Sequence, residues 1–155
     1  IDIMMAGGAS AVFHGMGEED VKRIMQYPFN MFASDASIRV LNAGMPHPRG
    51  SGTNARVLGK YVREEKVISL EEAIRRMTSL PAQKFQLSDR GILKEGMAAD
   101  IVIFDEKEVK DMATFEKPHV YSKGFHYVIV NGVITAEKEK HLGVRAGKAL
   151  YHISQ

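Results

Sequence analysis

The sequence predicts an α/β protein built in two parts, because its two halves carry different patterns. Helix signals alternate with short apolar runs as far as residue 88, which is the rhythm of a parallel α/β architecture. From Asp89 onward, short strands separated by Gly, Asp and Asn predict a small β region. We therefore place a domain boundary between an α/β part, residues 1–88, and a β part, residues 89–155.

The composition is that of an ordinary globular protein, and it argues against several functional classes of protein. Of 155 residues, 45% are hydrophobic and 26% are charged, and the net charge is +2, which speaks against a nucleic-acid or anionic-membrane surface. The sequence has no cysteine, which excludes disulfides and thiolate zinc sites. No apolar run approaches the ~20 residues of a membrane span. We expect a cytoplasmic protein with neither nucleic-acid nor membrane partners.

Three helices are predicted in the first part. The acidic residues 18–20 suit the positive end of a helix dipole, and this helix ends before Pro28. Thr53 is the expected N-cap of a second helix. One face of that helix carries Val57, Leu58, Tyr61 and Val62. Ser69 and Glu72 form a capping box that opens the third helix.

Three strand signals complete the expected elements. The mostly apolar run 29–35 lies between a helix and a loop, which predicts a strand buried on both faces. Residues 101–104 predict a second strand. Residues 128–135 predict a hairpin, because Asn131-Gly132 can adopt positive φ at both central positions of a type I′ turn.

Two side chains near the end of the first predicted strand suggest chemistry. Asp35 ends that strand, where it is either a turn or N-cap aspartate or a carboxylate that holds a metal or moves a proton. Arg49 lies in the following loop, which is rich in Pro and Gly. It is either a solvated loop arginine or a bidentate ligand for a carboxylate. Together, the acid and the arginine suit a site for an anionic substrate.

The remaining motifs exclude more than they indicate. The six histidines form neither a His-x-His nor a His-Glu-x-x-His pair, so the sequence contains no self-contained zinc motif. No serine lies in a Gly-x-Ser-x-Gly turn, which argues against a serine hydrolase. The methionines fall largely at apolar positions typical of core filling.

The run from His47 to Glu64, together with Ser34-Asp35-Ala36, resembles the N-acyl-D-amino-acid deacylases, or D-aminoacylases, of the metal-dependent amidohydrolase superfamily. The similarity continues through Leu70-Glu71-Glu72-Ala73-Ile74, Met77-Thr78-Ser79-Leu80-Pro81-Ala82 and Asp89-Arg90-Gly91. The stretches 96–105 and 128–132 are shared across amidohydrolases and indicate only the superfamily. The resemblance covers nearly the whole chain.

The resemblance implies the C-terminal part of a (β/α)8 TIM-like barrel over 1–88, followed by strands of a small β-sandwich domain over 89–155. It also implies a hydrolase that uses one or two zinc ions to cleave the amide bond of N-acyl-D-amino acids. By this likeness Asp35 contacts the metal, takes a proton from the metal-bound water and gives it to the leaving amine. Zinc lowers the pKa of its bound water to about 7, so a nearby carboxylate can accept the proton of that water. Arg49 would bind the substrate's α-carboxylate, and His47 would shape the loop.

The resemblance also implies that the other metal ligands and most barrel strands lie upstream of Ile1. We therefore expect a fragment that is inactive alone and that self-associates, with the missing N-terminal portion as its natural partner. The sequence departs from the family at Ala36, usually Gly, and at Ser51 and Asn54-Ala55, which leaves the substrate preference open. Two alternatives stay open: a dihydroorotase- or hydantoinase-like amidohydrolase, and a non-catalytic carboxylate-binding or assembly domain.

Overall fold

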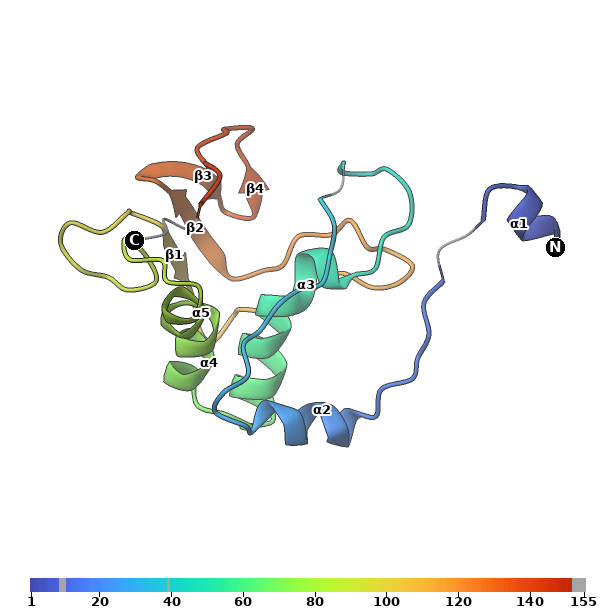
Figure 1. Ribbon diagram of the computed structural model, residues 1–155, viewed down its shortest axis with the longest axis horizontal. Coiled ribbons are helices and arrows are strands. Elements are labelled where there is room, and N and C mark those ends of the chain that lie inside the picture. Colours follow the sequence, from blue (N-terminus) through green and yellow to red (C-terminus); the bar gives the residue numbers. More distant parts are fainter. Residues whose placement is uncertain (9–10, 39, 152–155) are drawn as a thin grey trace.

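The computed structural model describes residues 1–8, 11–38 and 40–151 (Figure 1). Its helices are α1 (Asp2–Met5), α2 (Glu18–Met25), α3 (Arg49–Arg56), the π-helix η1 (Val57–Glu64), α4 (Leu70–Met77) and α5 (Ser79–Lys84). Its strands are β1 (Ile101–Phe104), β2 (Phe125–Val130), β3 (Val133–Glu137) and β4 (Lys140–His141). Within the described ranges, these strands form one antiparallel sheet in the order β1-β2-β3-β4. The helices therefore precede the sheet along the chain.

Local sequence chemistry explains two of the helix starts. Helix α2 begins with the acidic residues 18–20 and ends at Met25, as predicted. The backbone N–H of Glu72 donates to Ser69 Oγ at 3.2 Å, which confirms Ser69 as the N-cap of α4. The Glu72 side chain does not complete the capping box, because its carboxylate accepts from Arg75 and Arg76 instead.

The predicted start of the second helix was wrong. Helix α3 begins at Arg49 after Pro48, and it continues directly into η1. Thr53 therefore lies inside α3, where its hydroxyl donates to the carbonyl of Arg49 at 2.9 Å. Proline suits a helix start, since it lacks an N–H that would need a partner there. The predicted buried face is confirmed: Val57, Leu58 and Tyr61 are buried and Val62 is half-buried.

The predicted strand over 29–35 was also wrong. These residues form no strand, Phe29 is 83% exposed and the rest are exposed or half-buried. A run of apolar residues becomes a strand only when neighbouring strands accept and donate its backbone hydrogen bonds. No parallel strand pair occurs among the described residues, so this segment has no neighbour to pair with.

The strands of the second part follow the sequence closely. Strand β1 covers the predicted residues 101–104, and it pairs antiparallel with β2. Strands β2 and β3 form the predicted hairpin. Asn131 and Gly132 have φ of 48° and 81°, so both central residues adopt the left-handed conformation that a type I′ turn requires.

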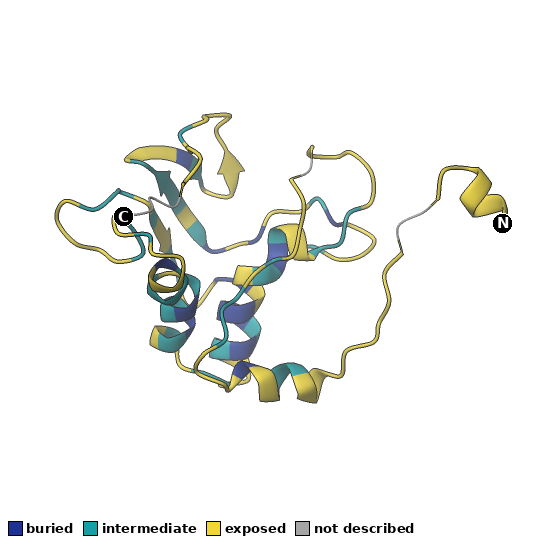
Figure 2. Ribbon diagram, viewed as in Figure 1, coloured by how far each residue is buried: buried dark blue, intermediate teal, exposed yellow. Residues whose placement is uncertain are grey.

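The core lies where the long helix α3–η1 meets α4, α2 and the segment around Val109 (Figure 2). Its buried members are Met25, Ala55, Val57, Leu58, Tyr61, Ala73 and Val109. Phe104 and Phe125 pack against this cluster, which attaches the sheet to the helices. Helix α1 lies apart from this body, and residues 1–8 and 11–17 are exposed (Figure 2). None of the helices that the structure describes could cross a bilayer.

A buried arginine ties three segments together. Arg76 of α4 is only 2% exposed. Its Nε donates to Glu72 Oε1 at 2.7 Å, and its Nη1 donates to Asn30 Oδ1 at 2.8 Å and to the carbonyl of Met25. These bonds satisfy a buried charge, which would otherwise be costly. They also hold the end of α2 and the segment that leads to Asp35 against α4.

Candidate active site

A cavity of about 330 Å³ lies between two neighbouring segments of the chain and a third that is distant in sequence. One wall is the segment that begins at Asp35. The second is the start of α3, with His47 and Arg49. The third is the segment from Pro118 to Tyr121. The structure therefore brings Asp35, His47 and Arg49, which the sequence singled out, onto the wall of one cavity.

Asp35 is neither buried nor the cap of a helix. Its side chain is 85% exposed, and its Oδ2 lies 2.9 Å from Nη2 of Arg49. Its backbone has φ of 48°, a left-handed conformation that aspartate tolerates better than most residues. The carboxylate thus faces open space, with one cation beside it.

Arg49 is the first residue of α3, and its position has local causes. Pro48 precedes it and starts the helix. The Arg49 carbonyl accepts a hydrogen bond from Thr53 Oγ1. Its side chain is 43% exposed, and its guanidinium makes the ion pair with Asp35. A partly exposed arginine beside a cavity can still receive a carboxylate from solution, because its guanidinium carries several N–H donors.

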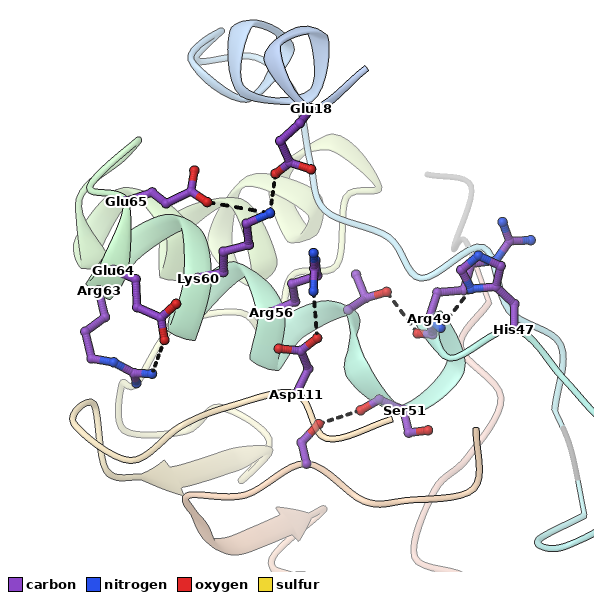
Figure 3. Close-up of polar contacts among 12 residues, drawn as sticks. Glu18, His47, Arg49, Ser51, Arg56, Lys60, Arg63, Glu64, Glu65 and Asp111 are labelled. Carbon is purple, nitrogen blue, oxygen red and sulfur yellow. Dashed lines mark hydrogen bonds and ion pairs between the residues drawn. The ribbon is translucent and has the colours of Figure 1, made fainter. Parts of the chain in front are cut away.

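His47 holds the same turn from its other side. The backbone N–H of Arg49 donates to His47 Nδ1 at 3.0 Å (Figure 3). The half-buried ring of His47 meets the ring of Phe115 edge to face, with centroids 5.0 Å apart. Burial lowers the pKa of His47 below its usual value, and the nearby charges of Arg49 and His14 lower it further. The neutral imidazole is therefore the favoured form at neutral pH.

The third wall was missed by sequence reasoning. Ser51 Oγ donates to the carbonyl of Pro118 at 3.1 Å, and Ser122 Oγ donates to the carbonyl of Ser51 at 2.7 Å. His119 Nε2 lies 3.0 Å from the carbonyl of Gly44. In the sequence, Ser51 is marked only as a departure from the family pattern, and His119 belongs to no histidine motif. No local pattern links residues 118–122 to the start of α3.

Ion pairs fix the helix that carries Arg49. Arg56 Nη1 lies 3.0 Å from Asp111 Oδ2, and Lys60 pairs with Glu18 of α2 (Figure 3). Asp111 belongs to the chain that leads toward the third wall. These contacts hold α3–η1 between α2 and the segment that leads to the third wall.

The described residues do not by themselves make a zinc site. They contain no group of three or more His, Cys, Asp or Glu side chains placed to hold a metal ion. Asp35 could supply one oxygen ligand, whereas Nδ1 of His47 is already occupied by the Arg49 amide. Zinc in proteins takes three or four protein ligands. The residues present therefore do not fit a zinc ion without further ligands.

Comparison with known proteins is consistent across sequence and structure. The chain is 45% identical to N-acyl-D-glutamate deacylase of Alcaligenes xylosoxydans xylosoxydans over 124 residues, which are 80% of this chain and 25% of that protein. It matches a crystal structure of D-aminoacylase with a TM-score of 0.79 and 42% identity, over 85% of this chain and 27% of the other.

A second solved structure carries a metal. N-acyl-D-glutamate deacylase from Bordetella bronchiseptica, complexed with zinc and a phosphonate that mimics the tetrahedral intermediate, matches with a TM-score of 0.72 and 43% identity. The match covers 80% of this chain and 27% of that one. A dihydroorotase of Lactobacillus acidophilus is more distant, at 36% identity over 59% of the chain. This chain spans about a quarter of the length of the deacylases it matches.

The family assignment follows from these comparisons. The amidohydrolase family matches residues 3–136, which is most of the chain and includes all three walls of the cavity. The deacylase relatives agree with this match in sequence, and the solved structures agree with it in fold. The chain therefore belongs to the amidohydrolase family.

Proposed function

We propose that this chain is the C-terminal part of a longer zinc-dependent deacylase that hydrolyses the amide bond of N-acyl-D-amino acids. The observation that carries the proposal is the pairing of Asp35 with Arg49 beside one cavity. The deacylase names of the relatives support the substrate class. The match to only about a quarter of those proteins supports a longer enzyme.

Each cavity residue has a proposed role in that reaction. Arg49 binds the α-carboxylate of the substrate through its planar guanidinium. Asp35 accepts a proton from the attacking water and delivers it to the leaving amine, as a carboxylate within reach of both can do. His47 shapes the turn that presents Arg49. Asp35 is also the proposed metal ligand from this chain, and zinc, when bound by further ligands, activates the water.

The proposed domain boundary lies between residues 88 and 89. Every helix of the described structure ends before it, and every strand begins after it. This arrangement supports a helical part that belongs to a TIM-like barrel, residues 1–88, and a sheet that belongs to a small β-sandwich, residues 89–155. The longer enzyme would supply the remaining strands of both.

The 155-residue chain alone is proposed to be inactive and to self-associate. Large apolar side chains are exposed, among them Phe13 at 89%, Tyr27 at 63% and Phe29 at 83%. Exposed apolar surface drives association when nothing covers it. Sedimentation of the purified chain over a range of concentrations tests this, and a monomer at every concentration would contradict it.

The dihydroorotase relative gives the second candidate function, hydrolysis of a cyclic ureide. The longer enzyme, loaded with zinc, should be assayed on N-acetyl-D-glutamate, on its L-enantiomer and on dihydroorotate. The proposal predicts turnover of the D-acylamino acid alone. Turnover of dihydroorotate instead would favour the second candidate. A protein that takes up no added zinc and turns over none of the three compounds would indicate the non-catalytic carboxylate-binding domain.

A further inference from the structure

The start of α3 is held by the side chain and the carbonyl of one residue, His47. The Arg49 N–H donates to His47 Nδ1 at 3.0 Å, and the Gly50 N–H donates to the His47 carbonyl at 3.2 Å. Pro48, between them, has no N–H to donate. His47 therefore partners two of the first backbone N–H groups of α3, which have no partner within the helix itself.

The His47 ring is kept in place from outside the helix. His47 and His14 both meet the ring of Phe115 edge to face, each with centroids 5.0 Å apart. Such contacts prefer a defined geometry, so they limit rotation of the imidazole. The ring therefore points Nδ1 steadily at the Arg49 amide.

The hydrogen bond exists only for a neutral His47. A nitrogen that accepts an N–H carries no proton, so the remaining ring proton lies on Nε2. Protonation would place an N–H against the Arg49 N–H and a positive charge at the positive end of α3. The charged or titratable groups around His47 are Arg49 of α3, His14 across Phe115, and Asp35 and His119 on the cavity walls.

We propose that His47 is a positioning residue that orients Arg49 for carboxylate binding through its unprotonated Nδ1, so that protonation of His47 weakens binding of the substrate. The inference deepens the proposed function, since it rests on Arg49 as the carboxylate ligand. His47 acts through the Arg49 backbone and needs no contact with the substrate. The lowered pKa of His47 agrees with this role, because it extends the range in which the bond is intact.

The test uses NMR of the isotope-labelled 155-residue chain, with N-acetyl-D-glutamate as the carboxylate probe. We expect the His47 ring to carry its proton on Nε2 above its pKa, and the Arg49 amide resonance to titrate together with that ring. Between about pH 7.5 and a pH below the midpoint of that titration, the dissociation constant of the probe should rise about fivefold, the effect of losing one capping bond.

Three variants separate positioning from general structure. His47→Ala should bind the probe about fivefold more weakly than the wild type at about pH 7.5, and its affinity should not change at the lower pH. His47→Asn should recover most of that loss, since an asparagine oxygen can accept from the N–H two residues on, and it should bind without the pH dependence. His141→Ala is the matched control: His141 Nδ1 accepts from the Gly143 N–H at 3.0 Å in the same way, but at β4, and it does not line the cavity.

Two results would overturn the inference. One is an Arg49 amide resonance that does not change as the His47 ring titrates. The other is a pH dependence that survives in His47→Asn, which would assign it to His14 or His119. If the wild type binds no probe at about pH 7.5 while the amide still follows His47, the positioning stands and the carboxylate role of Arg49 in the proposed function fails.

Discussion

Nη2 of Arg49 lies 2.9 Å from Oδ2 of Asp35, and both side chains are substantially exposed, at 43% and 85%. An ion pair this exposed stabilises a protein by at most about 1 kcal/mol. A substrate carboxylate can therefore displace Asp35 from Arg49 at little cost. The pair keeps the cation and the carboxylate beside the same cavity while leaving each free to act on a substrate.

The role proposed for Arg49 predicts a specific kinetic defect. Arg49→Lys keeps the positive charge but loses the planar fork that binds a carboxylate through two hydrogen bonds. In the longer enzyme, we expect KM for N-acetyl-D-glutamate to rise by about tenfold or more, with kcat changed far less. Steady-state kinetics over a range of substrate concentrations measure this split. A loss confined to kcat would remove Arg49 from substrate binding.

Acid should weaken the fold through Glu72. Hydrogen bonds from Arg75 and from the buried Arg76 lower the pKa of Glu72 from 4.5 to about 2. Because the folded pKa lies below the unfolded one, the stabilisation is fully present above about pH 4.5 and is lost as the pH falls toward 2. Glu72→Gln should be less stable than the wild type at neutral pH, and the difference should shrink in acid.

Urea unfolding at several pH values checks this expectation. Glu64→Gln is the control, because Glu64 is 54% exposed and pairs with Arg63 at the surface. That variant should follow the wild-type profile. A constant difference between wild type and Glu72→Gln across the whole pH range would show that the Glu72 carboxylate is not linked to folding.

One glycine should be irreplaceable for steric reasons. Gly124 has φ of +83°, and an added Cβ would lie 2.5 Å from the backbone nitrogen of Val109, a core residue that is 1% exposed. Gly124→Ala should therefore lower the free energy of unfolding by about 2 kcal/mol or more. Gly147→Ala is the control, since nothing lies within 4 Å of its added Cβ. Equal urea midpoints for the two variants would contradict this packing.

Local chemistry made several elements predictable from the sequence. The Ser69 cap and the Asn131-Gly132 turn depend on a few neighbouring residues, and both are confirmed. The run 29–35 was misjudged because a buried strand is defined by its neighbours in space, and a single segment cannot show whether they exist.

Part of the site was predictable because its residues are near one another in the chain. Asp35, His47 and Arg49 lie close together in sequence, and all three line the same cavity. His119 and Tyr121 join that cavity through long-range packing, which leaves no periodic or spacing signal. The burial of Arg76 could not be predicted from the sequence either, because its partner Asn30 lies on a distant segment.

The central claim is that the Asp35 carboxylate moves the proton in amide hydrolysis. Asparagine preserves the shape of the side chain but cannot accept a proton. The direct measurement is kcat of the longer, zinc-loaded enzyme carrying Asp35→Asn on N-acetyl-D-glutamate. Asp20→Asn, at an exposed position in α2, is the control and should retain full activity. We predict that Asp35→Asn loses about a thousandfold in kcat with an unchanged unfolding midpoint, whereas turnover close to the wild type would contradict the claim.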